Sequence, residues 1–63
     1  MNSEATILVL EDERPQILAL RATLQPIGNV VDFSDPQRAL DYLQEQEVDA
    51  AVIDIHMPNM PLN

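Results

Sequence analysis

Three short apolar runs, separated by segments with helical periodicity, constrain the fold of this chain more than any other feature. They occupy residues 7–10, 30–33 and 48–53. Short runs rich in apolar and β-branched residues are typical of strands that a parallel sheet buries on both faces. Because the runs alternate with helical segments, the sequence predicts an α/β fold with a parallel sheet and right-handed βαβ units. Crossovers that run outward from a central first strand predict the strand order 2-1-3, with the two helices on opposite faces.

The first helical segment begins near Pro15, since proline is well tolerated in the first turn of a helix. Pro26 and Gly28 are expected to end it. Its predicted apolar stripe consists of Ile17, Leu20 and Leu24, with Arg21 at the margin and Leu18 beside it.

The second helical segment starts with the pattern of a capping box. Ser34 precedes Gln37 by three residues, so we expect the Ser34 hydroxyl to cap this helix. Ala39, Leu40 and Leu43 form its predicted buried face.

Composition excludes several classes of site. The chain has 63 residues, no cysteine, one histidine and a net charge of −8. It therefore lacks disulfides, thiolate metal sites and a histidine-based zinc site. The acidic excess disfavours nucleic acid and anionic membranes as direct partners, because both bind clustered positive charge. The N-terminal residues lack the basic region of a signal peptide, and no apolar stretch approaches the about 20 residues of a membrane span, so we expect a cytoplasmic protein.

Acidic residues follow two of the three predicted strands. Glu11 and Asp12 come after the first strand, and Asp54 comes after the third. Ligands of open α/β sheets bind beyond the carboxyl ends of the strands. If these strands are neighbours, the three carboxylates converge and repel each other unless a cation is present, and Mg²⁺ prefers such oxygen ligands. A carboxylate can also accept a phosphoryl group and form an aspartyl phosphate.

A simpler interpretation remains open for these acids. Asp is common in turns and at helix caps. Asp12 and Glu13 would also be stabilised beside the positive end of the first helix without any metal.

The motifs around these acids resemble those of a known family. Residues 7–13, Ile-Leu-Val-Leu-Glu-Asp-Glu, resemble the opening strand and acidic pair of two-component response-regulator receiver domains. Residues 52–58, Val-Ile-Asp-Ile-His-Met-Pro, resemble the third strand, phosphorylation site and following loop of that family. The similarity extends from Thr6 to Met60. It implies a partial flavodoxin-like, doubly wound sheet, and a chain (residues 1–63) that corresponds to the N-terminal half of a truncated receiver domain.

The resemblance also implies roles for individual residues. Asp54 would accept the phosphoryl group from a histidine kinase. Glu11, Asp12, Asp54 and the backbone carbonyl of His56 would hold Mg²⁺, while Met57 and Pro58 would shape the loop. The His56 side chain is expected to be exposed and without a role. Such a domain is a regulatory phosphoacceptor that at most catalyses its own phosphorylation, and is not an enzyme in the ordinary sense.

The chain departs from the family in one respect that bears on activity. The second half of a receiver domain carries a hydroxyl residue that reads the phosphoryl group and a lysine that pairs with it. This chain contains no lysine. We therefore expect phosphotransfer to be impaired.

Two alternative functions belong to other classes. One is a Mg²⁺-dependent phosphatase with an aspartyl nucleophile, but such enzymes usually place a second acid where this chain has His56. The other is a non-catalytic interaction fragment that pairs with another receiver or with itself. An exposed edge of the third strand would favour a homodimer, because unpaired strand edges recruit other strands.

Overall fold

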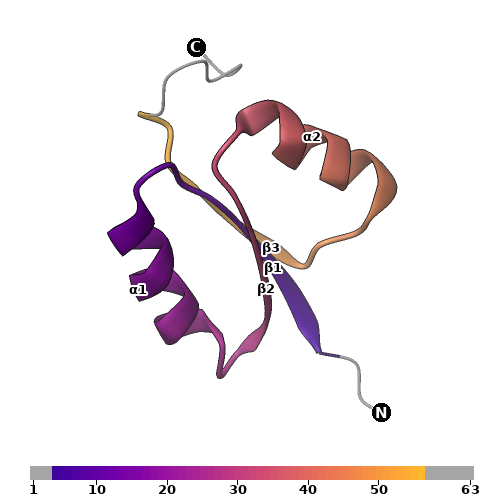
Figure 1. The fold of residues 1–63 in the computed structure, drawn as a ribbon. Coiled ribbons are helices and arrows are strands. Elements are labelled where there is room, and N and C mark those ends of the chain that lie inside the picture. Colours follow the sequence, from indigo (N-terminus) through magenta and orange to yellow (C-terminus); the bar gives the residue numbers. More distant parts are fainter. Residues whose placement is uncertain (1–3, 57–63) are drawn as a thin grey trace.

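The computed structural model describes residues 4–56 as one parallel sheet with two helices (Figure 1). The elements in chain order are β1 (Ala5–Leu10), α1 (Arg14–Leu24), β2 (Gly28–Phe33), α2 (Pro36–Glu45) and β3 (Ala50–Ile53). Both strand pairs are parallel, and the order β2-β1-β3 places β1 in the centre. Figure 1 views the sheet edge-on, with α1 and α2 on opposite sides. The predicted α/β class, strand order and helix placement are therefore confirmed.

The central strand supplies the core on both faces of the sheet. Leu8 and Leu10 pack with Ala39 of α2, and Leu8 is fully buried. The alternate residues Ile7 and Val9 point to the opposite face, which α1 covers, because side chains of a strand alternate between faces. Both faces of β1 are thus apolar, as the continuous run in the sequence predicts.

The second strand begins at Gly28, two residues before the predicted start. A Cβ atom at Gly28 would lie 2.5 Å from the backbone oxygen of Ala5, which is its partner in the ladder. The close approach of the two backbones requires glycine at this position. A residue expected only to end the preceding helix therefore also starts the strand.

The predicted cap of α2 is wrong. Asp35, and not Ser34, is the N-cap: its Oδ1 accepts a hydrogen bond from the backbone N–H of Gln37 at 3.3 Å. Pro36 explains the difference, because proline disfavours the helical conformation in the residue before it. Asp35 is accordingly extended, and the helix starts one residue later than a Ser34 cap requires.

The predicted buried face of α2 is only partly correct. Ala39 is buried, but Leu40 and Leu43 are 40% and 39% exposed. Tyr42 packs against the core in their place, with its ring centroid 5.3 Å from that of Phe33 in β2. On a helix, Tyr42 lies on one flank of Ala39, whereas the two leucines lie on the other.

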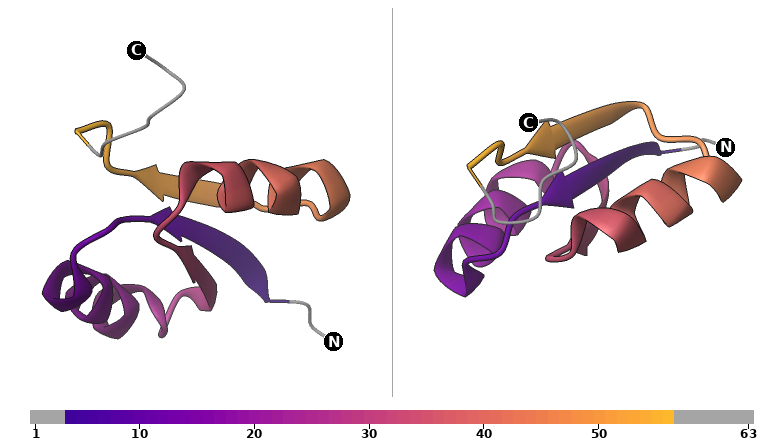
Figure 2. Two further views of the ribbon diagram at one scale, coloured as in Figure 1. Left: turned by 45° about the horizontal axis from the view of Figure 1, so that its top comes forward. Right: turned by 90° about the horizontal axis from the view of Figure 1, so that it is seen from above.

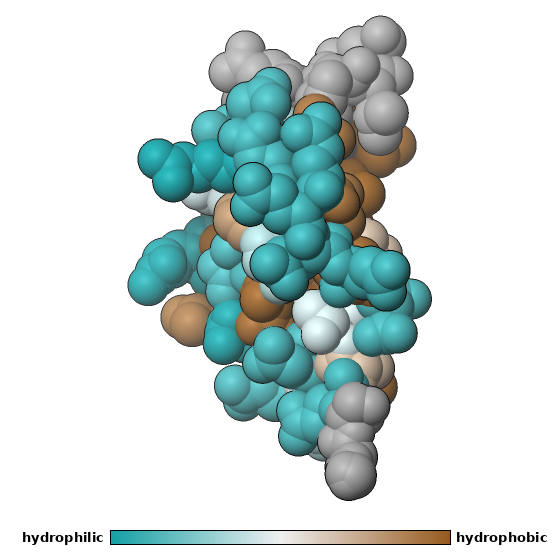
Figure 3. All heavy atoms as spheres, turned by 90° about the vertical axis from the view of Figure 1, so that its right-hand side faces the viewer, coloured by the Kyte–Doolittle hydropathy of each residue, from teal (hydrophilic) through white to brown (hydrophobic). Residues whose placement is uncertain are grey.

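The position of α2 over the sheet explains this exposure. The helix contacts β1 and β2 but not β3. In the right panel of Figure 2, β3 lies at the side of the sheet away from both helices. The leucine flank of α2 therefore has no strand beneath it, and Figure 3 shows apolar side chains exposed beside the hydrophilic surface of this face.

The third strand is shorter than predicted and lies at an edge of the sheet. It starts at Ala50. Asp49, the residue before it, makes two hydrogen bonds to the backbone of Thr6. Its backbone N–H donates to the Thr6 carbonyl oxygen at 2.8 Å, and its Oδ2 accepts from the Thr6 N–H at 2.7 Å. All four residues of β3 are exposed. Across residues 4–56, neither helix has the length and apolar character needed to cross a bilayer.

Candidate functional site

Backbone hydrogen bonds bring the carboxyl ends of the three strands together. The N–H of Glu11 donates to the carbonyl oxygen of Phe33 at 3.0 Å, just beyond the paired residues of β1 and β2. The N–H of Asp54 donates to the carbonyl oxygen of Leu10 at 3.0 Å. The ladders thus continue for one residue past each strand, and this extension aligns the acidic segments that follow β1 and β3.

Three carboxylates converge at this edge. Glu11, Asp12 and Asp54 each offer one oxygen, and these oxygens all lie within 4.8 Å of one another. Glu11 and Asp54 are half-buried, while Asp12 is exposed. The structure therefore brings together the three side chains that the sequence predicted as neighbours.

Local turns orient two of the three carboxylates. Oε2 of Glu11 accepts a hydrogen bond from the N–H of Glu13 at 3.2 Å. Oδ1 of Asp54 accepts from the N–H of His56 at 3.0 Å. Each bond uses one carboxylate oxygen, so the second oxygen of Glu11 and of Asp54 is available to a ligand.

The remaining predicted site residues follow Asp54. His56 is exposed, as expected, and lies in the turn after β3. The structure establishes its backbone N–H as a donor to Asp54, whereas its carbonyl oxygen stays a predicted metal ligand. Met57 and Pro58 lie outside the described residues.

A hollow of about 450 Å³ adjoins the acidic cluster. Gln16, in the first turns of α1, lines it together with Glu11 and Asp54. Gln16 was not among the predicted site residues. It could have been predicted from its place in the first turns of the helix that follows the acidic segment, since the first turn of such a helix faces the end of the sheet.

The donor set fits a hard divalent cation. Mg²⁺ takes oxygen ligands and is usually bound by one or two carboxylates together with waters and phosphate oxygens. Within residues 4–56, the ion pair of the structure joins Arg21 to Asp32, so no arginine side chain neutralises the three clustered carboxylates. Three converging carboxylates without a basic partner favour a cation among them.

These features define a class of protein. A parallel α/β sheet that gathers carboxylates at the ends of a central and a neighbouring strand is a ligand-binding module of the doubly wound type, with an acidic rather than a glycine-rich site. Its chemistry suits phosphoryl groups and the cation that accompanies them.

Comparison with known proteins identifies the family. The family model described as the response regulator receiver domain matches residues 7–61, which is most of the chain. The chain belongs to this family, and its context is therefore two-component phosphorelay signalling. Receiver domains take phosphoryl groups from histidine kinases, generally bind Mg²⁺, and act as regulatory phosphoacceptors.

A curated relative is consistent with this assignment. The chain is 28% identical over 60 residues to a protein named "Probable histidine kinase 1" from Oryza sativa subsp. indica. The match covers 94% of this chain but 6% of the relative, so the chain spans only a small part of that protein's length. No solved structure matches the chain.

Proposed function

We propose that this chain is a receiver module in which Asp54 accepts a phosphoryl group from a phosphohistidine of a histidine kinase. The observation that carries the proposal is the convergence of the Glu11, Asp12 and Asp54 carboxylates within 4.8 Å at the carboxyl ends of β1 and β3. We place the protein in the cytoplasm, where such a kinase would present its phosphohistidine.

Asp54 has one carboxylate oxygen suited to nucleophilic attack. Because Oδ1 accepts the hydrogen bond from the N–H of His56, we assign Oδ2 as the nucleophile. Oδ2 forms a bond to phosphorus while the phosphorus–nitrogen bond of the donor breaks. The imidazole nitrogen leaves with the electron pair of that bond and takes up a proton from solvent.

The residues proposed to hold Mg²⁺ are Glu11, Asp12, Asp54 and the backbone carbonyl of His56. Mg²⁺, when bound, neutralises charge on the phosphoryl oxygens. The hydrogen bond from the N–H of Glu13 to Oε2 of Glu11 keeps the Glu11 carboxylate turned toward this site before any ligand arrives.

A phosphatase is the weaker alternative for the same carboxylates. Phosphatases with an aspartyl nucleophile commonly use a second acid two residues later as the general acid or base. His56 stands at that position, and its backbone, not its side chain, contacts Asp54. A lasting aspartyl phosphate therefore fits the site better than rapid turnover.

Phosphorylation can be tested directly. The chain is incubated with acetyl phosphate and MgCl₂, and the product is followed by intact-mass measurement. We expect the mass of one added phosphoryl group, dependent on Mg²⁺ and lost in Asp54→Asn. Asp41→Asn is a matched control, because Asp41 is exposed on α2. Labelling that persists in Asp54→Asn would refute the assignment.

We also propose that residues 1–63 correspond to the N-terminal half of a receiver domain, and that two copies of this chain associate through β3. The exposure of all four β3 residues supports this, as do the exposed leucines of α2. A strand edge with apolar residues on both faces is self-complementary, and closed two-fold symmetry is the common outcome for such surfaces.

A further inference from the structure

The positive charge of this acidic chain is concentrated around one strand. Three arginines are its only basic residues apart from His56 and the N-terminus. Arg21 is occupied: its Nη1 forms an ion pair with Asp32 of β2 and donates to the carbonyl oxygen of Val30 at 3.4 Å. Arg14 and Arg38 have no ion-pair partner among residues 4–56. Two uncommitted guanidinium groups thus remain in a chain of net charge −8.

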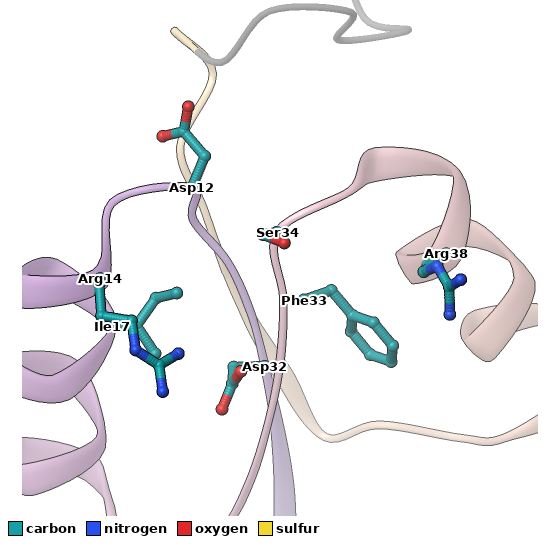
Figure 4. A pocket seen from close by; sticks show the side chains of 7 residues that line it. All are labelled: Asp12, Arg14, Ile17, Asp32, Phe33, Ser34 and Arg38. Carbon is teal, nitrogen blue, oxygen red and sulfur yellow. The ribbon is translucent and has the colours of Figure 1, made fainter.

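Both of these arginines line the same hollow, which has a volume of about 450 Å³ (Figure 4). Its lining residues are Asp12, Arg14, Ile17, Asp32, Phe33, Ser34 and Arg38. Arg14 is the first residue of α1, and Arg38 lies in the first turn of α2. Figure 4 shows the two arginines on either side of the end of β2, with Phe33 and Asp32 between them. The hollow therefore lies at the carboxyl end of β2 and is bounded by both helices.

The charges of this hollow differ from those of the chain as a whole. The Asp32 carboxylate is paired with Arg21, so its charge is largely balanced. Asp12 is the remaining acid of the lining, against two guanidinium groups, and Figure 4 shows its carboxylate pointing away from them. The amino-terminal turns of α1 and α2 add partial positive charge at the same place. The hollow consequently attracts anions, whereas the rest of the surface repels them.

The chemistry of the lining matches a peptide better than a bare ion. Phe33 is half-buried and supplies apolar contact area, and the Ser34 hydroxyl can donate or accept a hydrogen bond. The outer edge of β2 has no neighbouring strand among the described residues, so its backbone groups are free to pair with an extended segment. Arg14 and Arg38 can each bind one carboxylate in the bidentate manner of guanidinium groups.

We propose that this hollow, which we call the β2 hollow, is a docking site for an acidic peptide segment of a partner protein. One acidic side chain pairs with Arg14 and another with Arg38, and the segment lies along the outer edge of β2. Asp12 borders both the β2 hollow and the carboxylate cluster, so a docked segment would lie beside the phosphorylation site. The proposal does not depend on phosphorylation of Asp54.

The test uses a fluorescein-labelled hexaglutamate peptide and fluorescence anisotropy with the full chain. We expect binding that weakens with added salt, and roughly tenfold weaker binding in the Arg14→Gln, Arg38→Gln double variant, because two exposed ion pairs are lost. The Arg14→Lys, Arg38→Lys variant keeps both charges but loses the bidentate geometry, so its affinity should fall between those of the original chain and the double glutamine variant. Gln44→Ala, on the outer surface of α2, is the control and should bind as the original chain does.

Several outcomes would overturn the proposal. Equal binding by the double glutamine variant would show that the arginines do not hold the peptide. Equal binding of a hexaglutamine peptide would remove the charge argument. If inorganic phosphate displaces the peptide completely and binds as tightly as the peptide does, the β2 hollow is a simple anion site and not a docking surface. Circular dichroism of each variant separates these results from a loss of fold, and the lysine variant provides a second comparison.

Discussion

The N–H of Asp54 donates to the carbonyl oxygen of Leu10 over 3.0 Å, which ties the proposed phosphoacceptor to the end of the central strand. Glu11 and Asp12 follow Leu10 directly, so one backbone bond sets the spacing between the acceptor and its two acidic neighbours. The distances among the three carboxylates therefore depend on the β1–β3 ladder as much as on the side chains themselves. Changes to that ladder are expected to disturb the site without altering any of its residues.

Mg²⁺ binding should depend on Asp12. We expect weak binding of Mg²⁺ at the cluster, measured by NMR shifts of Glu11, Asp12 and Asp54. This binding should be lost in Asp12→Ala, because one of the three clustered carboxylates is removed. Asp41→Ala is the control, since Asp41 is exposed on α2. Shifts that spread over the whole acidic surface and survive Asp12→Ala would argue against a specific site.

Phosphorylation of the chain by acetyl phosphate should be slow. The chain has no lysine to pair with the phosphoryl group, so part of the electrostatic stabilisation of the transition state is absent. We expect only a small labelled fraction in a time course measured by mass spectrometry. Rapid and nearly complete labelling would show that the residues present here suffice for the reaction.

Gly28→Ala should destabilise the fold by about 1–3 kcal/mol, because the added Cβ meets the backbone oxygen of Ala5 at 2.5 Å and the backbone must shift. Urea denaturation followed by circular dichroism measures this change. Asn29→Ala is the neighbouring control, since the Asn29 side chain is exposed. Similar urea midpoints for the two variants would mean that β1 and β2 can move apart at this end without loss of stability.

Removing the cap of α2 should distinguish the two candidate capping residues. Asp35→Ala should lower the free energy of unfolding by about 1 kcal/mol, because the N–H of Gln37 loses its acceptor. Ser34→Ala should change it by less than about 0.5 kcal/mol, since Ser34 does not cap the helix. If thermal or urea unfolding shows a larger loss of stability for Ser34→Ala than for Asp35→Ala, Ser34 caps the helix, as the sequence predicted.

Association through β3 should respond to charge and salt. Salt screens the repulsion between two acidic chains, so sedimentation should show more dimer as ionic strength rises. Ile53→Glu places a charge in the proposed interface and should abolish the dimer. Ile27→Glu is the matched control, because Ile27 is 65% exposed but lies before β2, away from β3. A monomer whose unfolding midpoint does not vary with concentration would contradict the proposed association.

The sequence by itself determined the class of fold and the acids of the site. The alternation of apolar runs with helical periodicity fixed the element types and their order, because these patterns reflect the local backbone periods of strands and helices. The strand order followed from the handedness of βαβ crossovers. Glu11, Asp12 and Asp54 were predicted as site residues because they lie within two residues of a strand end, and neighbouring parallel strands end at the same edge.

The tertiary structure decided which side of each element is covered. Helical periodicity predicts burial of Ala39, Leu40 and Leu43 alike. Because α2 lies over β1 and β2, Tyr42 is covered, whereas the two leucines are exposed. The same packing placed Arg14 and Arg38, 24 positions apart in the sequence, around one hollow. The position of a helix over a sheet is set by contacts between residues that are distant in the chain. Local sequence patterns do not contain these contacts, so they predict neither which side chains are buried nor which distant residues come together.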